Sequence, residues 1–169
     1  MKKEATVHIF KDKDHNIVAC QLDDSKNIIH GFSLNDNQLT PLHMLNIALG
    51  QCLTELALLF LGRRNLQESC LTMIRINIKN AGTARLECAD IAVKLPLQLS
   101  AEDEVILARV LRQCPIYATL SESFPIRIII CEDRELISQY EQNVLTDIQH
   151  TKEITPFSCT LDYPVNLQY

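Results

Sequence analysis

The residues of this chain whose types could carry out chemistry are its cysteines, seven among 169 residues. A cysteine thiolate can attack an electrophile or bind a metal ion. No two cysteines form a C-x-x-C motif and none has zinc-finger spacing to a histidine, so we expect neither a disulfide scaffold nor a metal site. Most of the seven are expected to be small buried side chains. Two of them, Cys52 and Cys114, stand out by their surroundings.

Cys114 directly precedes Pro115. Proline cannot continue a helix unbroken, but it is favoured at the first position of a new one. If a helix restarts at Pro115, Cys114 is its N-cap residue, and the free backbone N–H groups there favour a thiolate. The alternative is a structural cysteine at a kink.

Cys52 lies inside an apolar run that ends at Gly62. At 100° per residue it falls about 180° from His43, at the centre of the predicted apolar side, and His43 is expected to be exposed. Burial would raise the pKa of the Cys52 thiol, and Glu55 one turn further on would raise it too. This pattern favours a cysteine that fills the core and leaves a reactive thiol as the alternative.

The composition argues against nucleic acids and nucleotides as partners. The net charge is −5, lysine and arginine are not clustered, and aromatic residues are few, so an electrostatic or stacking surface for nucleic acid is not expected. The chain has only four glycines and no glycine-rich phosphate loop. We therefore expect no cofactor.

The segment 42–61 is long enough to cross a membrane, but its composition predicts a buried helix instead. Polar and charged side chains are costly within a bilayer. The segment contains five of them: His43, Asn46, Gln51, Thr54 and Glu55. The N-terminus lacks the apolar core of a signal peptide, so we expect a cytoplasmic protein with reduced thiols and no membrane partner.

The patterning predicts one domain of α+β class. Runs rich in β-formers predict a meander over 5–34, a hairpin of strands 72–80 and 85–97, and a strand over 124–131. The turn lies within 80–85, and a phase shift predicts a bulge between Cys88 and Ala89. Helices are expected from Pro41 to Gly62, from Ser100 and from Asp133, and a C-terminal strand over 157–169.

Two segments taken together resemble the OsmC/Ohr family, the osmotically inducible and organic hydroperoxide resistance proteins. The segment "TPLHMLNIALGQCLTEL" is similar to the family's first cysteine helix, in which the cysteine follows the proline by eleven residues, as Cys52 follows Pro41. The segment "LSAEDEVILARVLRQCPIYATL" is similar to its second cysteine helix, with Cys114, Pro115 and Ile116 in the Cys-Pro-apolar motif. The resemblance covers about residues 5–131.

This resemblance implies an N-terminal β-meander and two central cysteine-bearing helices packed on an antiparallel sheet, in an intertwined homodimer. Residues 1–131 would form the OsmC-like domain, and residues 132–169 an extension of one helix and one strand packed on it. The implied activity is that of a thiol peroxidase that reduces organic hydroperoxides, with Cys52 peroxidatic and Cys114 resolving. An external dithiol would reduce the resulting disulfide.

The chain departs from the family pattern at three places. Leu42 stands where active members carry a glutamate, and no arginine precedes Arg63 to hold the thiolate. Tyr117 stands where many relatives have a small polar residue or histidine. Arg63, Arg64 or a lysine could replace that arginine. Two alternatives therefore stay open: a non-catalytic dimer of the same fold that binds a small hydrophobic ligand, and a structural dimer whose thiols are incidental.

Overall fold

The computed structural model describes residues 3–11, 17–22, 27–29, 41–66, 68–79 and 85–150, and the side chains of 7–11, 41–66, 68–79 and 85–142. The elements follow one another as β1 (Lys3–Lys11), β2 (Ile17–Leu22), β3 (Asn27–Ile29), α1 (Pro41–Gly62), β4 (Cys70–Lys79), β5 (Arg85–Leu95), α2 (Ala101–Leu111), α3 (Pro115–Ser121), β6 (Ile126–Glu132) and α4 (Arg134–His150). The predicted α+β class is confirmed. The predicted turn within 80–85 and the strand over 157–169 fall largely or wholly outside the described residues.

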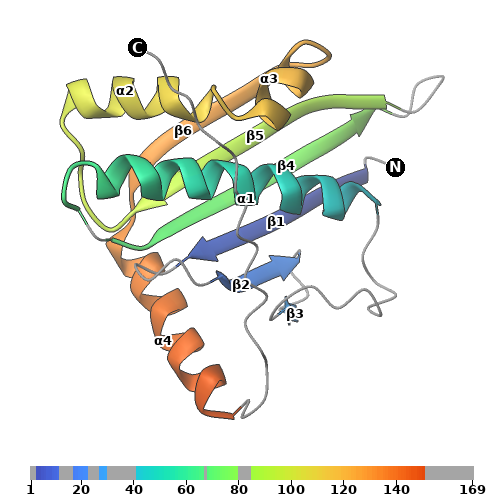
Figure 1. The fold of residues 1–169 in the computed structure, drawn as a ribbon. Helices are drawn as coiled ribbons and strands as arrows, with labels where there is room; N and C mark the ends of the chain where they lie inside the picture. The colour runs from blue at the N-terminus through green and yellow to red at the C-terminus, as the bar shows by residue number, and fades with distance from the viewer. Residues whose placement is uncertain are drawn as a thin grey trace.

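The strands form one six-stranded sheet in the order β3-β2-β1-β4-β5-β6 (Figure 1). All neighbours are antiparallel except β5 and β6, which are parallel. The expectation of an antiparallel sheet is therefore wrong at its last strand. The reason is the connection: α2 and α3 carry the chain back over the sheet, so β6 enters in the direction of β5.

α1 lies against the middle of the sheet (Figure 1). A Cβ atom added to Gly50 would lie 2.7 Å from Ile9 Cγ1 and 3.1 Å from Ile74 Cδ1. The helix approaches β1 and β4 this closely because Gly50 has no side chain. The Thr54 and Thr72 hydroxyls, 2.7 Å apart, share a hydrogen bond across the same contact.

α1 is also the one described helix that is long and apolar enough to cross a membrane. Of the most apolar stretch of this helix, 56% is buried inside the fold. Its buried side faces β1, β4 and α2, as in the core helix of a folded domain.

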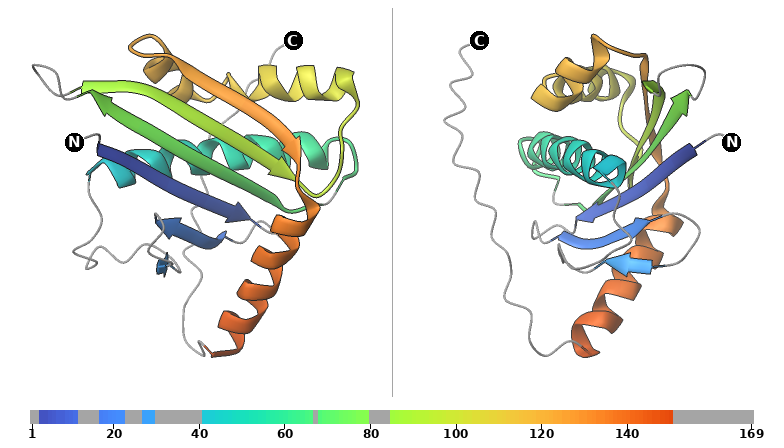
Figure 2. Two further views of the ribbon diagram at one scale, coloured as in Figure 1. Left: turned by 180° about the vertical axis from the view of Figure 1, so that it is seen from behind. Right: turned by 90° about the vertical axis from the view of Figure 1, so that its right-hand side faces the viewer.

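α2 and α3 cover the same face of the sheet as α1, as the right-hand view of Figure 2 shows. Ser100 is the N-cap of α2, and its hydroxyl accepts a hydrogen bond from the Asp103 amide, as expected from the sequence. Leu107 and Leu111 are fully buried, whereas Val105, an apolar residue of the same helix, is 53% exposed. The apolar side of α2 is therefore narrower than its sequence indicates.

α4 packs on the opposite face of the sheet. Ile9 contacts α1, so Phe10, the next residue along β1, points the other way. Phe10 and Leu71 form a second buried cluster with Ile137 and Tyr140 of α4. The Tyr140 hydroxyl lies 2.6 Å from His8 Nδ1 of β1, within hydrogen-bond distance. As expected, Asp133 caps this helix by accepting a hydrogen bond from the Leu136 amide.

The hairpin of β4 and β5 contains an irregularity close to the predicted one. Asn77 pairs with Cys88 and Ile78 with Leu86, which leaves Glu87 without a partner residue in the register. The bulge therefore lies one residue before the predicted position between Cys88 and Ala89. The apolar alternation changes phase only after the extra residue of the bulge, so the sequence pattern places the bulge slightly too late in the strand.

The packing of α4 can be tested with two isoleucines of different burial. Ile137 is 1% exposed. Replacing it by alanine should lower the free energy of unfolding by about 2–5 kcal/mol, because the side-chain carbon atoms beyond Cβ are lost from the core. The control Ile129→Ala, at a residue of β6 that is 48% exposed, should cost about 1 kcal/mol or less. Equal midpoints for the two variants in urea denaturation would contradict the buried position of Ile137.

Candidate active site

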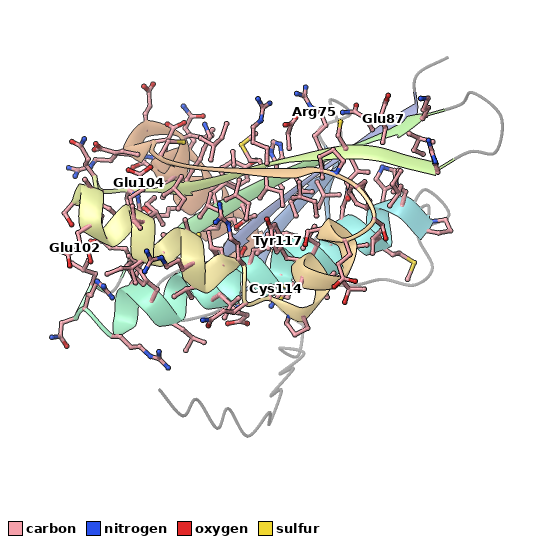
Figure 3. The ribbon with its side chains drawn as sticks, turned by 90° about the horizontal axis from the view of Figure 1, so that it is seen from above. Arg75, Glu87, Glu102, Glu104, Cys114 and Tyr117 are labelled. Carbon is pink, nitrogen blue, oxygen red and sulfur yellow. The ribbon has the colours of Figure 1, made fainter. Side chains whose placement is uncertain are left out.

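The two cysteines singled out by the sequence lie on separate elements that pack together. Cys52 is in the fourth turn of α1, and Cys114 occupies the junction between α2 and α3. Figure 3 shows Cys114 and Tyr117 at this junction, on the helical side of the sheet and away from Arg75 and Glu87. The second cysteine segment is therefore two helices, with Cys114 between them.

Pro115 is the reason for this junction. It begins α3 as its first residue, and Cys114 is the N-cap, as the sequence predicts for a restarted helix. The Tyr117 amide donates a hydrogen bond to Cys114 Sγ at 3.4 Å. Cys114 itself is fully buried. The local chain thus supplies backbone donors to a sulfur that is shielded from water.

The position of Cys52 corrects one expectation. It is half-buried, and the side of α1 that faces the sheet is centred on residues such as Gly50, Thr54 and Ala57. The prediction takes the side of the helix opposite His43 as the apolar, buried one, but Leu59 on that side is 50% exposed. His43, expected to be exposed, is half-buried.

The opposite pKa shifts of Cys52 and Cys114 point to a hydrogen bond between their thiols, in which the protonated Cys52 is the donor and Cys114 Sγ the acceptor. The pKa of Cys114 is lowered to about 7 by this bond first and then, against the effect of burial, by the backbone amides of Tyr117 and Ile116. The pKa of Cys52 is raised by the same hydrogen bond, by burial and by the negative charges of Cys114 and Glu55. The pair thus holds one proton between two sulfurs near neutral pH.

Cys70 shows what burial does without such a partner. It is fully buried on β4, and burial raises the pKa of its thiol to about 12. At Cys114 burial also raises the pKa, but the hydrogen bonds from Cys52 and from two backbone amides outweigh it. Of the five cysteines whose side chains are described, Cys70 and Cys114 are buried and the other three are half-buried. The expectation that most are buried is thus not met within the described residues.

Of the two charges near Cys52, the sequence analysis identified Glu55 but not Lys11. Lys11 of β1 forms an ion pair with Glu55, one turn after Cys52, and Gln51 Nε2 donates to the same Glu55 oxygen at 3.1 Å. Arg64 lies elsewhere, bound to Asp103 at 2.6 Å and stacked on Phe60. The alternation of Val7, Ile9 and Lys11 could have placed Lys11 on the helical side of the sheet. Nothing in the sequence indicates that Glu55 lies opposite.

The described part of the chain contains no group of three or more histidine, cysteine or carboxylate side chains arranged to hold a metal ion. The arrangement brings together two thiols, Cys52 and Cys114. One of them is deprotonated near neutral pH, and the other can be oxidised or can transfer its proton.

Comparison with known proteins finds similarity among solved structures. No family profile and no curated protein matches the chain. An organic hydroperoxide resistance protein from Elizabethkingia anophelis is 11% identical, with a TM-score of 0.49, and the match covers 76% of this chain and 96% of that one. An OsmC-like protein from Mycoplasma pneumoniae is 13% identical, with a TM-score of 0.48 and coverage of 78% and 97%. These names are those of the family that the two cysteine segments resemble.

The shared hydrogen bond can be tested by removing its donor. Cys52→Ala should raise the pKa of Cys114 from about 7 by about one unit or more, toward the ordinary range of a buried thiol. The measurement is the ultraviolet absorbance of thiolate against pH, with the Cys52→Ala/Cys114→Ala double variant as the blank. Cys88→Ala, at a sulfur bonded by Asn77 instead, is the matched control. An unchanged titration in Cys52→Ala would rule out the bond as the cause.

Proposed function

We propose that the chain is a divergent protein of the OsmC/Ohr type that reduces organic hydroperoxides through the Cys52/Cys114 pair. The proposal rests on the coupled protonation of the two thiols, which lowers the pKa of Cys114 to about 7 and raises that of Cys52. A thiolate is the form that attacks a peroxide. The formation of a disulfide requires the two sulfurs to come into contact.

The division of roles follows from access. Cys52 is half-buried, whereas Cys114 is fully buried, so the hydroperoxide meets Cys52. The shared proton first passes along the hydrogen bond to Cys114. The Cys52 thiolate then attacks the terminal oxygen, an S–O bond forms and the O–O bond breaks. The departing alkoxide takes the proton from Cys114, leaving an alcohol, a Cys52 sulfenic acid and a Cys114 thiolate.

The second half of the reaction uses Cys114 as the resolving residue. Its thiolate attacks the Cys52 sulfur, the S–S bond forms, and hydroxide leaves and takes a proton from solvent. An external dithiol then reduces the disulfide by exchange and restores both thiols. The proposed cytoplasmic location is consistent with such a reductant.

The surroundings of the thiols favour an apolar hydroperoxide. Half-buried apolar side chains of α1 and α3 pack against the core cluster that contains Cys114. They are Leu45, Leu56, Ile116, Tyr117 and Leu120. A hydroperoxide with a fatty or aromatic group would bury apolar surface there, and hydrogen peroxide would not.

The activity can be tested by mixing the reduced protein with cumene hydroperoxide. Intact mass should fall by two hydrogens as the disulfide forms, and the rate should rise with pH through about 7, because the thiolate form increases above the pKa of the pair. This loss of two hydrogens should be absent in Cys52→Ser and in Cys114→Ser, and it should be retained in the control Cys88→Ser. An unmodified protein after hours at neutral pH would refute the peroxidase and favour the alternative, a binding protein for a small hydrophobic ligand.

We also propose that the protein is a homodimer joined through the outer side of α1, with the residues after 131 packed as an extension on the same domain. Met44 and Leu59 lie on that side, are each about half exposed and flank Cys52, and Val105 of α2 is exposed as well. A second copy that covered these apolar side chains would also close the site from water.

Sedimentation equilibrium at micromolar concentration should therefore give the mass of two chains. Met44→Glu/Leu59→Glu should shift the protein toward monomer, because charged side chains would be buried at the interface. Ile129→Glu, an equally exposed position on β6, should leave the mass unchanged. A stable wild-type monomer would contradict the dimer.

A further inference from the structure

A buried ion pair links the sheet to α1 beside the thiols. The Lys11 side chain is only 4% exposed, and its ammonium group binds the Glu55 carboxylate, whose side chain is 35% exposed. Gln51 Nε2 donates to the same carboxylate oxygen. The cost of taking an ammonium group out of water is met by this contact, so Lys11 is fixed in place.

Glu55 is the residue through which this ion pair reaches the thiols. It lies three residues after Cys52, on a neighbouring part of the helix surface. Its negative charge favours the protonated form of Cys52. A carboxylate at this position would therefore suppress the thiolate unless a cation compensated it.

Among the described residues, the other elements around the pair show no cation bound to Glu55. α3 contributes the backbone amides of Ile116 and Tyr117. At the end of α2, Arg112 is exposed to solvent, and Arg64 is bound to Asp103. In the described part of the chain, the cation bound to Glu55 is Lys11.

We propose that Lys11 is a positioning residue for the thiol pair, whose ammonium group neutralises Glu55 so that negative charge can reside on the sulfurs one helical turn away. Lys11 touches neither sulfur in this arrangement and acts through the carboxylate. The consequence for catalysis rests on the proposed function, whereas the effect on the thiols does not.

The test is the thiolate absorbance of the reduced protein against pH. In Lys11→Met the charge of Glu55 is no longer compensated by the ammonium group. The midpoint of the pair should rise by about one unit, which lowers the thiolate fraction at pH 7 about fivefold. In Lys11→Met/Glu55→Gln both charges are absent, and the midpoint should return to that of the wild type or below.

Two further variants separate charge from structure. Lys11→Arg keeps the cation and should keep the wild-type midpoint. Lys94→Met breaks a comparable partly buried ion pair, with Asp133 at the start of α4, and should leave the thiols unchanged. A wild-type midpoint in Lys11→Met, or the same shift in Lys94→Met, would overturn the proposal. A double variant that stays as high as Lys11→Met would also overturn it.

If Lys11→Met does not fold, Glu55→Gln alone decides the matter. Removing the carboxylate should lower the midpoint whether or not Lys11 keeps its proton, and an unchanged or raised midpoint would contradict the proposal. None of these measurements uses a hydroperoxide. A protein inert to hydroperoxides can still show the shift, and an absent shift leaves the oxidation experiment valid.

Discussion

The packing of α1 against the α2–α3 junction is the constraint on which the thiol pair depends. It couples the protonation of Cys52 and Cys114, two residues that are far apart in the chain and lie on different elements. α1 approaches the sheet closely at Gly50, and Pro115 ends one helix and begins the next.

The pKa values of the thiols at the site result from burial, hydrogen bonds and nearby charges, which act in opposite directions. Burial raises the pKa of any thiol, as the value of about 12 for Cys70 illustrates. Three hydrogen-bond donors, one thiol and two backbone amides, outweigh that effect at Cys114. Glu55 raises the pKa of Cys52. Because Glu55 is bound by Lys11 of β1, the protonation of the thiol pair depends on the position of that strand.

The two faces of the sheet carry different parts of the molecule. α1, α2 and α3 cover one face and bring the thiols together, whereas α4 covers part of the other through Phe10, Leu71 and Tyr140. The residues of β1 alternate between these two environments, since Ile9 and Lys11 face α1 and Phe10 faces α4. One strand therefore supports both the thiol site and the added helix.

By itself, the sequence determined most of the local structure, because caps, prolines and alternation act within a few residues. The start of α1 at Pro41, the cap of α2 at Ser100 and the N-cap position of Cys114 are all examples. Local patterns could not decide which parts of the chain meet. The tertiary structure brought Cys52 to Cys114 and Lys11 to Glu55, and it made β6 parallel to β5 through the crossover of α2 and α3. The helical wheel also misplaced Cys52, because periodicity shows that a side is apolar but not whether sheet, helix or solvent covers it.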